Sequence, residues 1–177
     1  GYLASRGDAV IRQDLFAEAL RIVRLVRSLL AEPAVGGLLA LLLFTHARRA
    51  ARVDDDGGLV LLEQQDRSLW DRRQIDEGLA LVDDVLSRRK PGPYQVQAAI
   101  AALHAQATST STTDWAQIAA LYVALQRFVP TPVVRLNHAV AVAMAHGLDA
   151  GLSLVDALGR EGELDGYHLY WSTRGEL

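Results

Sequence analysis

Apolar residues recur every three to four positions along most of the chain, which is the spacing of one face of an α-helix. The first such stretch carries Leu15, Ile22, Val26 and Leu30 at this spacing, with charged residues mostly on the opposite face. The same pattern predicts seven helices, over residues 9–31, 34–52, 72–89, 94–107, 114–128, 133–146 and 148–158. We therefore expect an all-α protein.

The second predicted helix is apolar nearly all round as far as Thr45, which is typical of a helix buried at the centre of a bundle. Gly36 and Gly37 fall in its first turn. Because glycine has no side chain, we expect a neighbouring helix to approach closely at this point.

Turn-forming residues separate the helices. "DDDGG" at 54–58 predicts a turn, and the following residues 59–66 have no clear period, so they form either a short extended piece or an irregular loop. "KPGP" at 90–93 is the clearest break. We expect one helical domain over 1–177, with 1–90 and 91–177 as candidate subdomains.

Two passages have the order helix, proline-containing corner, helix. Their prolines, Pro33 and Pro132, lie 99 residues apart, which is close to three units of the roughly 34-residue tetratricopeptide repeat. The break at 90–93 does not fall on this period. The spacing predicts stacked helical hairpins resembling degenerate tetratricopeptide repeats.

Composition narrows the functional classes. The net charge is −3 and the pI is about 5.9, whereas a nucleic-acid-binding domain normally has a basic footprint. The chain has no cysteine, and its longest apolar run, 34–45, is about half the roughly 20 residues that a membrane helix needs. We expect a cytoplasmic protein that binds neither nucleic acid nor membrane. Because the chain starts at Gly1 rather than Met, we also expect it to be a fragment.

A dense charged segment at 46–73 interrupts the apolar helices. It holds equal numbers of basic and acidic residues, which does not fit a nucleic-acid patch, and its contiguous aspartates do not fit a calcium loop. Two interpretations remain: an arginine–carboxylate network that joins the second helix to the third, or solvated helix ends whose arginines complement the helix dipole. The residues are Arg48, Arg49, Arg52, Arg67, Arg72, Arg73, Asp54, Asp55, Asp56, Glu63, Asp66 and Asp71.

No motif indicates catalysis. The five histidines form no HExxH pair, and neither a nucleophile elbow nor a phosphate-binding glycine loop is present. We interpret the histidines, including His46 and His104, as polar-face or helix-end residues. The chain is predicted to have no catalytic residue, metal or cofactor.

The tryptophans and the C-terminal aromatic residues suggest packing and contact roles. We expect Trp115 to fill a gap between helices, and Trp70, inside the charged segment, to be the best candidate for an exposed interaction anchor. Tyr167, Tyr170 and Trp171 are expected to dock on the last helices.

Several segments, in this order, resemble the C-terminal extension of bacterial extracytoplasmic-function (ECF) sigma factors, in which a tetratricopeptide-like domain follows the promoter-binding regions. The resemblance covers about residues 1–166, and its most specific block is the one from 47 to 72. The segments are "DLFAEALRIVRLV", "EPAVGGLLALLLFTHARRAARVDDDGGLVLLEQQDRSLWDRRQIDEGLALV", "PGPYQVQAAIAALHAQA", "TDWAQIAALYVAL" and "PTPVVRLNHAVAVAMA".

The resemblance implies a regulatory domain in transcription initiation, with core RNA polymerase or the protein's own upstream sigma regions as partner. The promoter-binding regions themselves are absent and are expected upstream. The rival hypothesis is a small-molecule sensor whose inter-helix pocket gates the sigma factor. The residues that match the family's motif are a candidate structural joint and contact surface: Arg48, Arg49, Arg52, Asp54, Glu63, Asp66, Arg67, Trp70 and Asp71.

Overall fold

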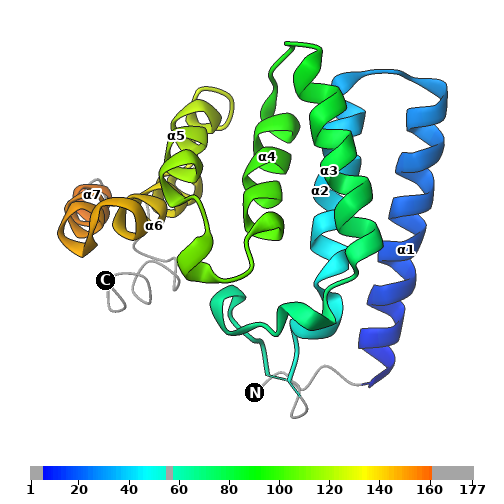
Figure 1. Cartoon of the computed structure of the whole chain (residues 1–177), viewed down its shortest axis with the longest axis horizontal. Coiled ribbons are helices and arrows are strands. Elements are labelled where there is room, and N and C mark those ends of the chain that lie inside the picture. Colours follow the sequence, from blue (N-terminus) through cyan, green and yellow to red (C-terminus); the bar gives the residue numbers. More distant parts are fainter. Residues whose placement is uncertain (1–5, 55–57, 161–177) are drawn as a thin grey trace. The chain divides into compact units, whose positions relative to one another are not determined.

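The computed structural model describes residues 6–54 and 58–160, with side chains from Leu15 onwards except that of Glu63. The prediction of an all-α protein with about seven helices is confirmed (Figure 1). Within the described residues, extended backbone pairs only at one isolated antiparallel bridge between Val53 and Leu59. The helices are α1 (Arg6–Leu29), α2 (Pro33–Ala47), α3 (Arg72–Ser87), α4 (Pro93–Gln106), α5 (Trp115–Gln126), α6 (Pro132–His146) and α7 (Leu148–Arg160).

The chain divides into two compact units, Gly1–Ser111 and Thr112–Leu177. The division lies about twenty residues beyond the break expected at 90/91, because α4 packs on α2 and α3 and so belongs to the first unit. The proline-rich turn at 90–93 therefore connects two packed helices rather than two subdomains.

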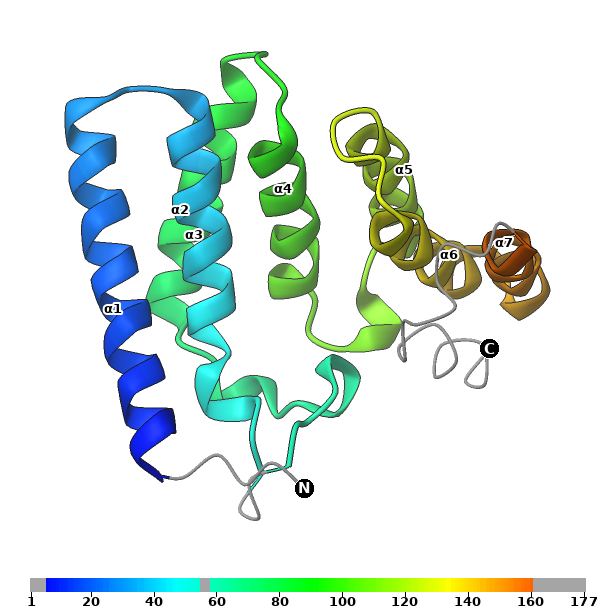
Figure 2. The same ribbon diagram turned by 180° about the vertical axis from the view of Figure 1, so that it is seen from behind.

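Helix α2 occupies the centre of the first unit. It contacts α1, α3 and α4, and within this unit each of the helices α1 to α4 runs antiparallel to the next (Figures 1 and 2). Its buried residues include Leu39, Ala40, Leu43 and Phe44. A helix with neighbours on several sides must be apolar on several sides, which is why the sequence of α2 has no clear polar face.

The close approach expected at Gly36 and Gly37 is confirmed. A Cβ atom on Gly37 would lie 2.8 Å from the backbone nitrogen of Gln95 and 2.9 Å from the carbonyl carbon of Tyr94, both at the start of α4. A Cβ on Gly36 would lie 2.6 Å from Cγ1 of Val85 on α3. These two glycines let α2 pack against both α3 and α4 within one turn.

Helix starts follow their sequence signals. Pro33, Pro93 and Pro132 occupy the first turns of α2, α4 and α6, where the missing N–H costs nothing. Asp71 and Asp114 cap α3 and α5 by accepting hydrogen bonds from backbone N–H groups of the first turn.

The second unit consists of α5, α6 and α7, with α6 packed on both of the others. Its core includes Leu136, Ala139, Val155 and Leu158, which are almost fully buried. The docking expected of Tyr167, Tyr170 and Trp171 concerns residues outside the described part of the chain.

Candidate interaction site

The charged segment between α2 and α3 forms a folded connection rather than an unstructured loop. Three short 3₁₀ helices follow one another in it, at Arg49–Ala51, Leu62–Gln64 and Arg67–Leu69. Between the first two, the backbone N–H of Val60 donates to the carbonyl of Arg52 (3.0 Å). Of the two alternatives for 59–66, the structure shows the irregular loop, with an isolated bridge at Leu59 and a 3₁₀ turn at Leu62–Gln64.

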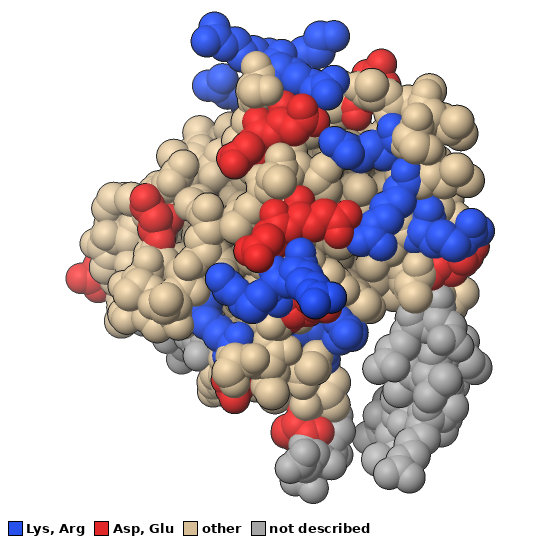
Figure 3. Space-filling model, turned by 45° about the vertical axis from the view of Figure 1, so that its right-hand side comes forward, with Lys and Arg blue, Asp and Glu red and all other residues tan. Residues whose placement is uncertain are grey.

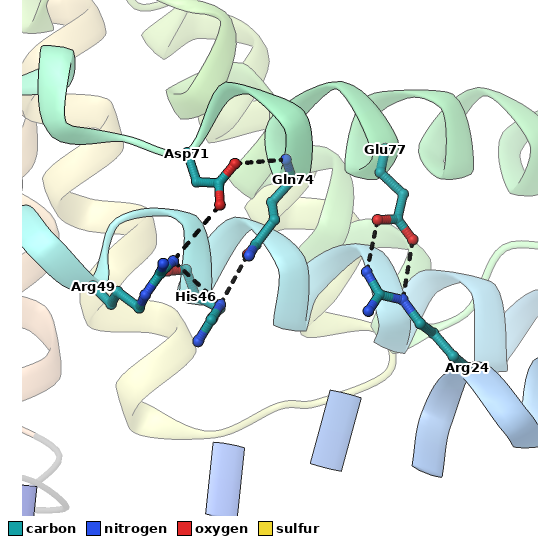
Figure 4. Close-up of polar contacts among 6 residues, drawn as sticks. All are labelled: Arg24, His46, Arg49, Asp71, Gln74 and Glu77. Atoms are coloured by element: carbon teal, nitrogen blue, oxygen red, sulfur yellow. Dashed lines mark hydrogen bonds and ion pairs between the residues drawn. The ribbon is translucent and has the colours of Figure 1, made fainter. Parts of the chain in front are cut away.

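Asp71 joins the end of α2 to the start of α3. Its backbone N–H donates to the carbonyl of Ala47 (2.9 Å), and its carboxylate accepts from the backbone N–H of Gln74 (3.3 Å). The guanidinium of Arg49 lies 3.8 Å from the same carboxylate (Figure 4). The arginine–carboxylate pair expected between these helices therefore forms here, although its length and exposure make it a weak contribution.

His46 and Gln74 add a second link between α2 and α3. The imidazole Nδ1 of His46 lies 2.9 Å from Oε1 of Gln74 (Figure 4), and the ring stacks on Phe16 of α1 with centroids 5.2 Å apart. Arg49 also donates to the carbonyl of His46 (3.2 Å). His46 thus touches both neighbouring helices.

Helix α1 is tied to α3 by exposed ion pairs. Arg24 holds Glu77 in a two-point contact, with distances of 2.7 and 3.3 Å (Figure 4), and Arg27 lies 3.2 Å from Asp84. Their side chains remain more than a third exposed. Exposed pairs of this kind contribute little to the free energy of unfolding. They therefore influence where α1 lies along α3 more than they stabilise its packing.

Trp70 is the packed centre of the charged segment. Its side chain is only 3% exposed, so the expectation of an exposed anchor at this position is wrong. The guanidinium carbon of Arg67 lies 4.6 Å from the centroid of its ring and that of Arg48 lies 5.8 Å away. Both distances are within the range of cation–π attraction. The indole therefore packs the segment against the end of α2.

Arg67 fastens the same segment to α4. Its Nη1 donates to the carbonyl oxygens of His104 and Ala107, at 2.6 and 2.8 Å. These carbonyls belong to the last turn and the C-terminal cap of α4, where the helix has no backbone donors left to satisfy them. The arginine thus replaces two missing donors and completes the link from α2 through Trp70 to α4.

Arg48 occupies a more unusual environment. It is half-buried near Trp70, and burial, followed by the charges of Arg52 and Arg67, lowers its pKa from the ordinary value. It forms no ion pair with a carboxylate among the described residues. The expected network is thus only partly built from opposite charges, because two of its arginines contact an aromatic ring instead.

The acidic candidates Asp54 and Asp66 have local backbone roles. Asp54 closes the turn at 54–58 by accepting from the N–H of Gly58 (2.6 Å), and Asp66 caps the third 3₁₀ helix by accepting from the N–H of Ser68 (2.8 Å). Arg52 is exposed, and the side chain of Glu63 is outside the described residues. The acids at 54 and 66 thus shape the backbone.

His104 was not singled out from the sequence, yet it lies beside the arginines. Burial, together with the charges of Arg48 and Arg67, lowers its pKa to about 4. No sequence motif marks this histidine, because its environment comes from segments more than thirty residues away. Only its position in the last turn of α4 agrees with the expected helix-end role.

We expect the stability of the first unit to fall between pH 7 and pH 4.5 because of His104. In this window the unfolded chain binds a proton at about pH 6.5 while the folded form resists protonation down to about pH 4, so acid favours unfolding. The expected loss is on the order of 1–2 kcal/mol after allowance for partial exposure. Urea denaturation of the wild type and of His104→Gln at several pH values measures it. An identical dependence of the free energy of unfolding on pH in both proteins would contradict the prediction.

A stripe of exposed apolar residues runs along α1. Leu15, Ile22, Leu25 and Leu29 are 64%, 46%, 51% and 73% exposed. Positions separated by three, four and seven residues lie on one side of a helix, so these four side chains share one side of α1 over roughly 20 Å, with the exposed Glu18 between Leu15 and Ile22. We call these four residues the α1 stripe. The sequence pattern predicted apolar residues on this helix but placed Leu15 and Ile22 on its buried face.

Charged side chains are mixed in sign on the surface of the molecule. Figure 3 shows Lys and Arg interspersed with Asp and Glu over the face that it presents. The described residues include no group of three or more His, Asp or Glu side chains arranged to hold a metal ion. None of the described helices has the length and apolar character needed to cross a bilayer.

Comparison with known proteins gives one family match and one relative. Residues 1–86 match a family of unknown function, DUF6596. The whole chain is similar to an uncharacterized protein of Rhizobium meliloti (strain 1021), with 51% identity over 178 residues. The chain spans 42% of the length of that relative. No solved structure matches. The family match covers α1, α2, the charged segment and nearly all of α3, so it coincides with the candidate site.

Proposed function

We propose that this chain is the C-terminal regulatory domain of an ECF sigma factor and acts in transcription initiation through protein contacts. Two lines of reasoning support the proposal: the resemblance of its segments to that extension, and the match of residues 1–86 to DUF6596, known as a C-terminal domain of sigma-70-like proteins. The longer relative leaves room for further regions in the whole protein. The partners are core RNA polymerase or the upstream sigma regions of the same protein, in the cytoplasm, without catalysis.

The observation that carries the contact role is the α1 stripe. Helical-repeat arrays normally end in a helix with a polar outer face, because an apolar outer face reduces solubility. Here the first helix of the unit leaves Leu15, Ile22, Leu25 and Leu29 exposed. Apolar side chains exposed along one side of an outer helix are typical of a protein contact surface.

The first experiment is a pull-down with the purified chain as bait, against core RNA polymerase and separately against the sigma regions of the full-length protein. We expect Leu25→Glu and Ile22→Glu to weaken capture about tenfold or more, since each buries a charge in the contact. Both positions are exposed, so the melting temperature of each variant should equal that of the wild type.

Ala17→Glu is the matched control. It adds the same charge to the same helix at an exposed position on a different side from the α1 stripe. Equal loss of capture with Ala17→Glu would contradict a role for the stripe. Capture of polymerase favours a docking module, and capture of the sigma regions alone favours an intramolecular regulator. Capture of neither partner contradicts the contact role.

A small-molecule sensor is the second candidate, and one cavity supports it. A cavity of about 180 Å³ lies between α1, α2 and α3, with Arg27, Asp84 and Arg88 in its lining. It is smaller than the roughly 300 Å³ at which ligand pockets usually begin, so only a small polar ligand fits. A ligand-induced rise in melting temperature would support this function over the first.

A further inference from the structure

Two guanidinium groups converge on one buried indole in the first unit. The guanidinium carbons of Arg67 and Arg48 lie 4.6 and 5.8 Å from the ring centroid of Trp70. The two arginines come from opposite ends of the charged segment and are both half-buried, whereas the indole is 3% exposed. Arg52 adds a third positive charge nearby, and its charge acts on Arg48.

The hydrogen-bond donors of this cluster outnumber its acceptors. Nη1 of Arg67 is satisfied by two carbonyl oxygens of α4. Arg48 bonds to described residues through its backbone, and among the described residues the buried indole Nε1–H of Trp70 has no acceptor. Neither Arg48 nor Arg67 lies within ion-pair distance of a described carboxylate. Within the described part of the chain, the cluster thus offers N–H groups and positive charge without a carboxylate in ion-pair distance.

Folding alone does not account for this arrangement. A half-buried guanidinium that lacks an acceptor loses hydration and gains no charged partner, and like charges nearby add repulsion. The chain has 21 acidic residues and a net negative charge, so it does not lack carboxylates in general. A buried donor without an acceptor in a native protein calls for an explanation, and a bound ion is one of the recognised ones.

We propose that Arg48, Arg67 and Trp70 form a binding site for a phosphate group, either inorganic phosphate or the phosphoryl group of a small ligand. Guanidinium forks bind phosphate oxygens through paired, charge-assisted hydrogen bonds. A doubly charged anion matches the two arginines better than a single carboxylate does. The partial exposure of both arginines leaves the site open to solvent. This site does not depend on the proposed function, because the α1 stripe is a separate surface.

The test is a titration of the purified chain with inorganic phosphate. Chloride is added to keep the ionic strength constant, so that phosphate binding is distinguished from general screening of the protein's charges by salt. Binding is followed by melting temperature and by isothermal calorimetry. We expect saturable binding to the wild type and a dissociation constant at least about tenfold higher for Arg48→Met, since the lost hydrogen bonds are charge-assisted. The melting temperature of free Arg48→Met should equal or exceed that of the wild type.

Arg73→Met is the matched control, because it removes the same charge from an exposed position at the start of α3. It should bind phosphate as the wild type does. Arg48→Lys keeps the charge without the fork and should bind with intermediate affinity; it serves as the second variant if Arg48→Met fails to fold. Arg67 is unsuitable because its loss also frees the carbonyls of α4. Absence of saturable binding to the wild type, or equal binding by Arg48→Met, overturns the proposal.

Discussion

Trp70→Ala is expected to destabilise the first unit by about 4 kcal/mol, which is the usual cost of truncating a large buried aromatic side chain. The indole is 3% exposed and lies close to Arg48 and Arg67, so its loss leaves a cavity and removes two cation–π contacts. Without the ring, Arg67 also loses one of the contacts that orient it toward the carbonyls of α4. Trp70→Phe keeps an aromatic face, so it should lower the free energy of unfolding clearly less than Trp70→Ala does.

Urea denaturation followed by far-UV circular dichroism measures this loss. Leu69→Ala is the matched control, because it truncates the adjacent residue, whose side chain is 52% exposed. We expect it to cost less than about 1 kcal/mol. Similar losses for Trp70→Ala and Leu69→Ala would show that the indole is not the packed centre of the charged segment.

Gly37→Ala is expected to cost about 2 to 3 kcal/mol, near the top of the range for overpacking. The new methyl group would lie 2.8–2.9 Å from backbone atoms of Tyr94 and Gln95. A backbone cannot rotate away as a side chain can, so α2 and α4 must separate. The gain in helix propensity, about 1 kcal/mol, offsets only part of this cost.

Gly36→Ala provides an internal comparison one residue away. Its methyl group would meet Cγ1 of Val85, a side-chain atom rather than backbone, but Val85 is buried and β-branched and can shift only slightly. The same gain in helix propensity applies, so the net cost should be about 1 kcal/mol and lower than that of Gly37→Ala. Thermal unfolding of both variants tests the pair. A larger loss for Gly36→Ala than for Gly37→Ala would contradict the close backbone approach of α2 and α4.

Sequence periodicity located the helices because helix formation depends on residues close along the chain. Apolar spacing and the prolines at 33, 93 and 132 predicted where helices lie and begin, to within a few residues. The absence of a polar face on the second helix predicted its central position. The glycine pair predicted a close approach for the same local reason, since a missing side chain is visible in the sequence itself.

Contacts between distant segments determined the rest. The exposed anchor expected at Trp70 is instead buried near Arg48 and Arg67, and the acids at 54 and 66 accept hydrogen bonds from backbone N–H groups in turns. The charge pattern was visible in the sequence, but the choice of partner for each charge was not. An arginine can stack on an aromatic ring, bind a carboxylate or cap a helix, and the sequence contains candidates for all three.

By itself, the sequence determined the helical class, the helix positions and the identity of the central helix, because each depends on spacing within a single segment. The tertiary structure decided that α4 belongs with the first unit, that α1 leaves an apolar stripe exposed and that His104 lies beside two arginines. Each of these depends on which surfaces meet after folding. Burial and pairing are properties of segments brought together from far apart in the chain, and a local pattern does not contain that information.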